Sequence, residues 1–244
     1  MERVDRRSEL EERLAAVRER IRRACVAAGR DPASVELLAV TKTVPAEDVA
    51  TLIDLGLTAF AENRVQEAEA KVEAVARLRP QARPRWHMVG TLQRNKAKSV
   101  ARWADRVESV DSIRLADALD AAVRREQETG RRTDRLPILI QYSVDGDPRR
   151  GGVPRADLLP LAEHVATCAG LHLAGLMSVA PLGADPDEAF ADVAAAAAEL
   201  RDRFPQATVL SAGMSGDLEA AIRHGSGVVR VGTALVGDRP ITSR

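Results

Sequence analysis

Aromatic residues are scarce in this chain: Phe, Trp and Tyr together make up 2% of its 244 residues. This scarcity argues against single-stranded nucleic-acid binding, which uses aromatic side chains as stacking platforms. The formal net charge is zero, with 36 Lys and Arg against 36 Asp and Glu, whereas dedicated polyanion binders carry a basic domain or stripe. We therefore expect no nucleic-acid partner.

Long apolar runs and clustered cysteines are also missing. No stretch approaches the roughly 18 consecutive apolar residues of a membrane span, and the charged residues 1–14 do not form a signal peptide. Cys25 and Cys168 lie far apart, which is typical of buried thiols in a reducing compartment. The four histidines show no metal-ligand spacing, and no CxxC motif exists. These absences favour a cytoplasmic protein without membrane contact and without a metal site.

Short apolar runs alternate with helical patterns along the chain, whose composition (45% hydrophobic, 30% charged) is that of an ordinary globular protein. The apolar runs predict strands at residues 35–40, 57–60, 85–89, 106–110, 136–142, 171–176, 207–210 and 228–231. Helical patterns lie at residues 45–56, 65–78, 93–103, 112–128, after Pro154, at 187–203 and at 217–224. This alternation indicates a parallel sheet with crossover helices.

Eight is the number of strands that closes a (β/α)8 TIM barrel, and the chain has about the usual length for that fold. A doubly wound open sheet is the alternative. We see no linker or composition break, so we expect an α/β chain with one barrel domain over residues 1–244.

An amphipathic helix precedes the first strand. Ser8 is expected to cap it, with Glu11 completing a capping box. Apolar residues then recur at spacings of three or four at Leu10, Leu14, Val17, Ile21 and Cys25. Almost no helix follows the eighth strand, so we expect the leading helix to cover the gap that a missing eighth helix leaves.

Reactive residues of a barrel lie where strands end and the following loops begin. Lys42 comes directly after the first strand, where partial desolvation would favour the neutral amine and a Schiff base with a carbonyl. The alternative is a lysine that extends to water. Residues 211–216 form a Gly/Ser-rich turn that opens a helix, and Gly232 and Thr233 offer further backbone donors. These loops suit a phosphate, although plain turn and capping chemistry would also explain them.

Arg230 ends the last strand beside this turn. A pyridoxal phosphate (PLP) site normally places an Asp or an Arg against the pyridine nitrogen, whereas a rim arginine in a surface salt bridge is the alternative. A Schiff-base lysine with a phosphate site indicates PLP, or else the phosphorylated carbonyl substrate of a lysine aldolase.

Six segments, in order over nearly the whole chain, resemble the pyridoxal phosphate homeostasis protein family, which is similar to the N-terminal barrel of alanine racemase. They are residues 38–45 (LAVTKTVP), 61–67 (AENRVQE), 86–96 (WHMVGTLQRNK), 175–181 (GLMSVAP), 211–222 (SAGMSGDLEAAI) and 229–237 (VRVGTALVG). The resemblance implies an alanine-racemase-like barrel with PLP held by Lys42 as an internal aldimine.

The resemblance also implies roles for further residues: Asn63 near the ring, Arg230 at the pyridine nitrogen, and Ser215, Gly232 and Thr233 at the phosphate. Met214 would pack nearby, and His87 and Met177 would line the site. The full implied set of cofactor residues is Lys42, Asn63, His87, Met177, Ser211, Met214, Ser215, Arg230, Gly232 and Thr233.

The chain departs from the family in the loop after the fifth strand. The family pattern there is Gln-Val-Asn, then Glu and Lys, whereas this chain has Gln141-Tyr142-Ser143, then Asp147 and Arg150. Ala61 stands where Gly is commoner, and Ala212 stands where Met is usual. These departures concern the contacts of the strand-five loop more than the cofactor site.

The expected function is PLP binding without strong catalysis. Arg230 has no acceptor, so it would donate to an unprotonated pyridine nitrogen and weaken the electron sink. Alanine racemases take a second base from a partner chain and an extra domain, for which this chain has no room; Tyr142 is a weak candidate for such a base. We therefore expect a monomeric PLP homeostasis protein that buffers PLP and supplies it to apo PLP-enzymes or amino acids. The alternatives are a PLP-dependent amino-acid racemase of low activity and a PLP-free lysine aldolase.

Overall fold

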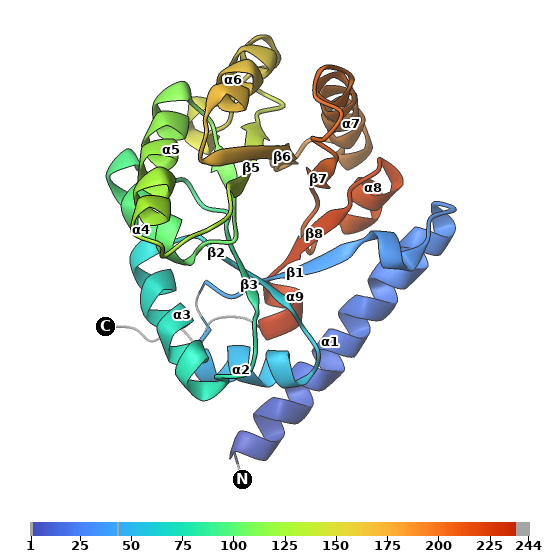
Figure 1. Ribbon diagram of the computed structural model, residues 1–244. Coiled ribbons are helices and arrows are strands. Elements are labelled where there is room, and N and C mark those ends of the chain that lie inside the picture. Colours follow the sequence, from blue (N-terminus) through green and yellow to red (C-terminus); the bar gives the residue numbers. More distant parts are fainter. Residues whose placement is uncertain (1, 43, 238–244) are drawn as a thin grey trace.

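Eight parallel strands form a closed barrel in the computed structural model of the protein, which describes residues 2–42 and 44–237 (Figure 1). Each strand pairs with its neighbours in sequence, and β8 closes the barrel on β1. The strands are β1 (Glu36–Val40), β2 (Ala59–Glu62), β3 (Arg85–Met88), β4 (Arg106–Val110), β5 (Leu136–Tyr142), β6 (Leu171–Ser178), β7 (Val209–Ser211) and β8 (Val228–Val231). The predicted barrel is confirmed, and the open sheet is wrong. The expected domain is thus described up to Gly237, since residues 1, 43 and 238–244 lie outside the described part.

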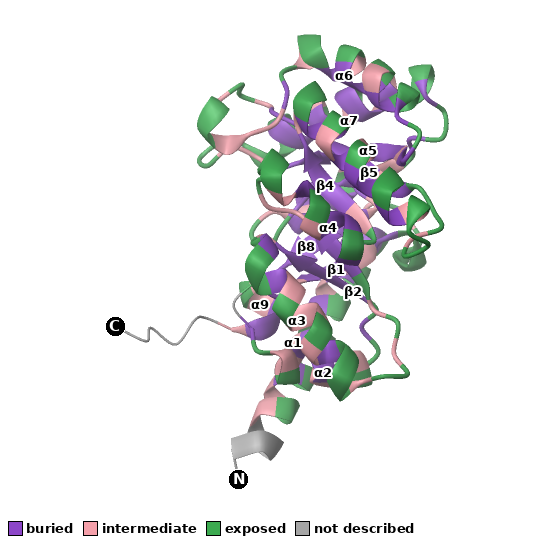
Figure 2. Ribbon diagram, turned by 60° about the vertical axis from the view of Figure 1, so that its left-hand side comes forward, coloured by how far each residue is buried: buried purple, intermediate pink, exposed green. Residues whose placement is uncertain are grey.

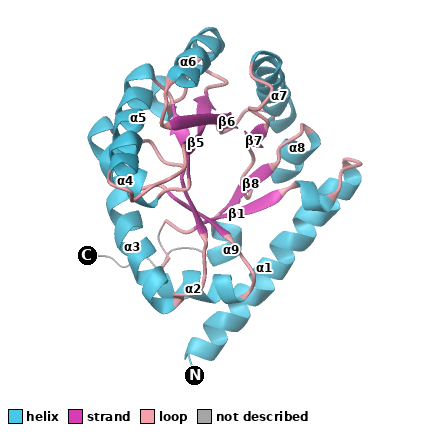
Figure 3. Ribbon diagram, in the orientation of Figure 1, coloured by secondary structure: helices cyan, strands magenta, loops and turns pink. Residues whose placement is uncertain are grey.

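Helices surround the barrel and turn their buried faces toward it (Figures 2 and 3). They are α1 (Glu2–Ala27), α2 (Ala46–Asp54), α3 (Val65–Leu78), α4 (Ala97–Trp103), α5 (Ile113–Glu128), α6 (Arg155–Thr167), α7 (Pro186–Arg203), α8 (Leu218–Arg223) and α9 (Thr233–Val236), with short 3-10 turns η1 (Pro32–Ser34), η2 (Arg94–Lys96) and η3 (Pro148–Arg150). Among the described residues, no helix has both the length and the apolar character that crossing a membrane requires.

Strand ends differ from the prediction where polar residues are buried. The bounds of β4, β5 and β8 are as predicted, whereas β2 extends to Glu62, β6 to Ser178 and β7 to Ser211. All three of these polar residues are fully buried. The apolar pattern predicts strand ends that are too early here, because it treats polar residues as exposed. Hydrogen-bond partners allow these polar residues to be buried, and the pattern does not reveal those partners.

Helix α1 occupies the place that an eighth barrel helix would take. It packs against α8, α9 and α2, and Leu14 and Val17 on its inner face are only 2% and 4% exposed. The expectation that the leading helix covers this gap is therefore confirmed. The expected cap at Ser8 is wrong, because the helix begins at Glu2. Arg6 belongs to the helix and binds the Asp48 carboxylate at 2.7 Å and the Val236 carbonyl at 2.9 Å.

Replacing Leu14 by alanine tests the packing of α1 on the barrel. A Leu→Ala change at a buried site costs about 2–5 kcal/mol, because it removes apolar contacts and leaves a cavity. We expect the free energy of unfolding in urea to fall by that amount. Leu78→Ala is the matched control, since Leu78 is 39% exposed and should lose less than about 1 kcal/mol. Equal losses in the two variants would contradict the packing described here.

Candidate functional site

A pocket of about 270 Å³ opens at the carboxyl ends of β1, β2 and β8. It is lined by Val40, Lys42, Asn63, Arg64, Glu67, Gly232, Thr233, Val236 and Gly237. The barrel order explains why these residues meet, because β1 lies between β2 and β8 and each strand contributes the loop that follows it. Four residues predicted from the sequence therefore share one pocket. Its volume is near the lower end for small-molecule sites, about 300 Å³.

The side chain of Lys42 is exposed at this pocket. The expectation that the strand end places this amine in a partly desolvated environment is wrong, because Lys42 lies in a turn beyond β1, on the open side of the pocket. The case for Lys42 therefore rests on its position in the pocket and not on burial.

Asn63, which also lines this pocket, has an unsatisfied polar atom. Its Oδ1 is buried and has no hydrogen-bond partner in the part of the chain that the structure describes. Gly90 packs on its backbone so closely that a Cβ there would lie 2.3 Å from the Asn63 carbonyl oxygen. This contact fixes Asn63, and its amide remains available to a ligand.

The β8 side of the pocket offers backbone donors. Helix α9 begins at Thr233, directly after Gly232, and the first amides of a helix have no carbonyl partner within it. Such amides bind anions, phosphate included. The hydroxyl of Thr233 adds a further donor. The predicted phosphate residues of the β8 loop are therefore in a suitable place.

Below Lys42 lies a buried ion pair that sequence reasoning missed. Glu62 Oε1 accepts hydrogen bonds from Thr41 Oγ1 and Lys71 Nζ, both at 2.7 Å, and Lys71 also donates to the Thr41 carbonyl. Glu62 is fully buried, and its Oε2 has no partner among the described residues. The pair fixes the residue that precedes Lys42. The sequence signal was the Glu at the end of a buried strand, which needs a partner.

A second polar network fills the barrel interior. Glu108 Oε1 lies 2.8 Å from His87 Nδ1, and its Oε2 accepts a hydrogen bond from Ser211 Oγ at 2.6 Å. Arg230 donates to the carbonyl and hydroxyl of Ser211, both at 2.8 Å, and to the Ser178 carbonyl at 2.7 Å. The network brings together three predicted residues, His87, Ser211 and Arg230. It shows that Arg230, which is 4% exposed, is not a rim arginine.

Sequence reasoning missed Glu108, which stands inside a strand with no motif around it. Burial acts to raise its pKa, but the hydrogen bonds of His87 and Ser211 and the charge of Arg230 outweigh that effect and lower the pKa. Burial lowers the pKa of Arg230 against the opposing charges of Glu108 and Asp217. The carboxylate and the guanidinium therefore support each other's charged forms. Along β8, Arg230 lies two residues before Gly232, about 7 Å deeper in the barrel.

The remaining predicted residues lie outside the residues that line the Lys42 pocket. Met177 is 2% exposed and packs with Leu139 in an apolar cluster of the barrel interior. Ser215 is half-buried, and its carbonyl accepts a hydrogen bond from Arg20 Nη1 of α1 at 2.6 Å. Met214 is 38% exposed. The β8 loop thus lines the pocket, whereas Met214 and Ser215 of the neighbouring β7 loop are not among its lining residues.

Tyr142 points away from the barrel mouth. Its hydroxyl donates to Asp192 Oδ2 of α7 at 2.6 Å, and burial together with Asp192 raises the pKa of the phenol. Tyr142 is the only tyrosine of the chain, so no tyrosine can serve as a base at the pocket. The loop after β5 is closed by Arg150, which donates to the carbonyls of Val179 and Ala180 at 2.8 and 2.9 Å.

Comparison with known proteins identifies the family. Residues 13–240 match the family described as alanine racemase, N-terminal domain. A pyridoxal phosphate homeostasis protein of Mycobacterium tuberculosis is 48% identical over 98% of this chain and 96% of its own length. The chain therefore belongs to the alanine racemase N-terminal domain family and, within it, to the pyridoxal phosphate homeostasis proteins.

Solved structures agree. PipY of Synechococcus elongatus with PLP bound has a TM-score of 0.78 and 35% identity over 93% of this chain and all of that chain. Alanine racemase from Corynebacterium glutamicum shares the fold, with a TM-score of 0.66 and 15% identity over 95% of this chain and 62% of that chain.

Replacing Glu108 by glutamine tests the interior network. The change removes one of the two negative charges, Glu108 and Asp217, that oppose the buried Arg230, and breaking a buried charged contact costs roughly 3–5 kcal/mol. We expect the free energy of unfolding at pH 7 to fall by about 3 kcal/mol. Glu163→Gln is the matched control: Glu163 is 54% exposed and lies 3.3 Å from Arg203, so its loss should stay below about 1 kcal/mol.

The pH dependence of the same variant gives a second check. Because folding lowers the pKa of Glu108, its stabilisation is complete above the ordinary carboxyl pKa of about 4.3. It is lost as the pH falls through the lower value of the folded state. The difference between the wild type and Glu108→Gln should therefore be constant near neutrality and shrink only in acid. A difference that vanishes between pH 7 and 5 would contradict the network.

Proposed function

We propose that this chain binds PLP in the pocket at Lys42 and buffers it within the cell, as a PLP homeostasis protein rather than as an enzyme. The observation that carries the proposal is the pocket itself, which gathers Lys42, Asn63, Gly232 and Thr233 in a member of the homeostasis family. We further propose that the chain acts as one PLP-binding domain, a cytoplasmic monomer, with apo PLP-enzymes or amino acids as the partners that receive PLP.

The residues present fit the cofactor. When bound, PLP supplies an aldehyde that condenses reversibly with a primary amine, and Lys42 offers that amine at the pocket. The amides at the start of α9 and the Thr233 hydroxyl suit the phosphate. The buried Oδ1 of Asn63, without a protein partner, marks a position where a ligand would complete the hydrogen bonding.

Lys42 is favoured over the other lysines of the chain by position. The sequence has four lysines, Lys42, Lys71, Lys96 and Lys98, and Lys42 is the one that lines the pocket. Lys71 lies beneath it with its amine bound to Glu62 and the Thr41 carbonyl. Lys71 therefore positions the Lys42 turn, and its amine is engaged in the ion pair with Glu62.

Arg230 supports the role of a carrier over that of an enzyme. Its guanidinium is fixed by Ser211 and Ser178 and has no acceptor atom. It therefore cannot accept a hydrogen bond from a protonated pyridine nitrogen, and the protonated form is the one that favours electron-sink catalysis. Racemisation also needs a base on each face of the substrate, and Tyr142 is turned toward Asp192. We propose that Arg230 and His87 shape the floor of the site, with Met177 and Ser211 beside them and with Met214 and Ser215 in the neighbouring loop.

Borohydride reduction of the PLP-loaded chain, followed by peptide mass mapping, tests the site. We expect one reduced adduct, on Lys42, because the other three amines lie outside the pocket or in an ion pair. In Lys42→Arg, which keeps the charge but removes the primary amine, labelling should fall sharply. Lys98→Arg is the control, since Lys98 is exposed on α4, and should be labelled like the wild type. An adduct spread over Lys71, Lys96 and Lys98 in the wild type would refute the proposed site.

Deuterium exchange at Cα of alanine separates the carrier from a racemase. The loaded chain should exchange far more slowly than the roughly 1 per second typical of an enzyme, because the hydroxyl of Tyr142, the candidate second base, is bound to Asp192. NMR of alanine in heavy water measures the rate. Exchange at enzyme rates that disappears in Lys42→Arg would favour the racemase and overturn the carrier role, while leaving PLP binding at Lys42 intact.

A further inference from the structure

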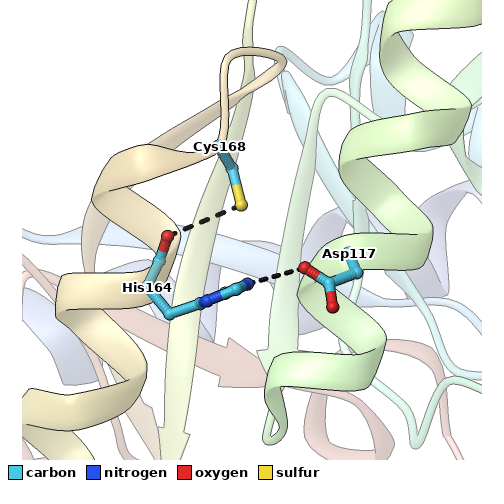
Figure 4. A group of neighbouring side chains, drawn as sticks. All are labelled: Asp117, His164 and Cys168. Carbon is cyan, nitrogen blue, oxygen red and sulfur yellow. Dashed lines mark hydrogen bonds and ion pairs between the residues drawn. The ribbon is translucent and has the colours of Figure 1, made fainter.

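A cluster of metal-ligating side chains lies between α5 and α6. It consists of Asp117 on α5, His164 in the last turn of α6, and Cys168, which ends α6 (Figure 4). One ligand atom from each residue lies within 4.8 Å of the other two, and no other such group of three occurs among the described residues. Figure 4 shows the three side chains directed into the same space between the helices.

From this cluster we propose a zinc site that clips α5 to α6. A thiolate, an imidazole and a carboxylate form a mixed sulfur, nitrogen and oxygen set, which suits zinc and argues against calcium or magnesium, since those ions prefer oxygen. Three protein ligands leave one position for water in a tetrahedral site. The site takes no part in PLP binding, because none of its residues lines the pocket.

The imidazole and carboxylate ligands require only a small adjustment to accept the ion. His164 Nε2 and Asp117 Oδ1 lie 2.6 Å apart, whereas two such ligands on one tetrahedral zinc lie roughly 3.3 Å apart, given metal–ligand distances of about 2.0–2.2 Å. The carboxylate must therefore withdraw by less than about 1 Å. The Asp117 side chain is 59% exposed, so it is free to do so.

The third ligand is held in place by its surroundings. Cys168 is 6% exposed, and its thiol donates to the His164 carbonyl at 3.6 Å. Arg135 Nη2 donates to the Cys168 carbonyl at 3.0 Å, and the Gly170 amide donates to Asp120 Oδ1 of α5 at 2.6 Å. These bonds fix the loop after α6 against α5. The sulfur therefore does not have to be ordered when the ion binds.

Binding is a proton exchange without redox chemistry. The sulfur of Cys168 forms a bond to zinc, and its proton leaves to the solvent. The imidazole and the carboxylate supply lone pairs and lose their contact with each other. Arg135, whose charge acts on Cys168, does not block the cluster, because its guanidinium binds the Cys168 carbonyl.

Sequence spacing alone did not reveal this cluster, and the expectation of no metal site came from that spacing. His164 and Cys168 are four residues apart, a spacing that brings two side chains together at one helix end. Asp117 comes from another helix, 47 positions earlier. The barrel brings α5 and α6 side by side, and the third ligand appears only in the folded chain.

Zinc titration of the untagged full-length chain tests the proposal. Calorimetry should give one zinc per chain, and X-ray absorption at the zinc edge should show one sulfur at about 2.3 Å with nitrogen and oxygen at about 2.0 Å. His164→Ala and Asp117→Asn, at partly exposed positions, should weaken binding by at least about 100-fold, since changing a residue that only supports a metal ligand already costs 10–100-fold. Cys168→Ser should remove the sulfur signal.

The chain provides matched controls. His224 pairs with Asp187 at 2.9 Å on the surface, in a contact that no described thiol joins, and Cys25 is a buried thiol in α1. His224→Ala and Cys25→Ser should bind zinc like the wild type. A zinc spectrum without sulfur, equal losses in the His224 and His164 variants, or no zinc retained after gel filtration would overturn the site.

Discussion

Closure of the barrel by β1 and β8 is the constraint on which the pocket depends. Four residues of each strand pair in register, from Glu36 with Val228 to Ala39 with Val231. This pairing joins the first strand to the last, so that the loop after β1 and the loop after β8 become neighbours. Lys42 and Thr233 share a pocket for this reason alone. The first strand and the last strand must therefore be in place before the site exists.

Helix α1 secures this closure from outside. It stands where an eighth helix would pack, and two of its arginines reach the loops at the mouth. Arg6 holds Asp48 and the Val236 carbonyl, next to the β1 and β8 loops. Arg20 binds Glu219 and the Ser215 carbonyl, in the turn after β7. Helix α1 thus contacts the loops at the barrel mouth as well as the core. One element provides both the packing on the barrel and the hydrogen bonds to these loops.

Buried charges inside the barrel fix position more than they add stability. Buried charges lose hydration energy that their mutual attraction only partly returns. The ion pair of Glu62 with Lys71 and the network that joins Glu108 to Arg230 through Ser211 therefore add little net stability. Each instead orients a backbone or side chain next to the pocket. Glu62 and Lys71 hold Thr41 just before Lys42, and Glu108 holds the Ser211 hydroxyl that Arg230 contacts. One network therefore borders the pocket at Lys42, and the other lies deeper in the barrel interior.

The periodicity of the sequence was sufficient to predict the fold, because the positions of the apolar residues determine the order of strands and helices. Helix α3 and strands β4, β5 and β8 lie where the apolar pattern places them. Polar burial was not predictable from that pattern: the orientation of Tyr142, the exposure of Lys42 and the role of Glu108 each depend on partners that are distant in sequence. The family motif pointed to both Lys42 and Arg230. Only the folded chain shows that Lys42 lines the pocket, whereas Arg230 is buried deeper in the barrel.

The two proposed ligands differ in how they depend on this architecture. The PLP pocket uses loops from the β1–β8 seam, whereas the zinc cluster uses the outer helices that follow β4 and β5. The two groups share no residue, and distant sites without shared partners contribute additively. Any ligand that binds only the folded chain stabilises it by mass action. Zinc would therefore raise stability without changing PLP affinity, since coupling between sites requires a second state of the barrel that one ligand prefers.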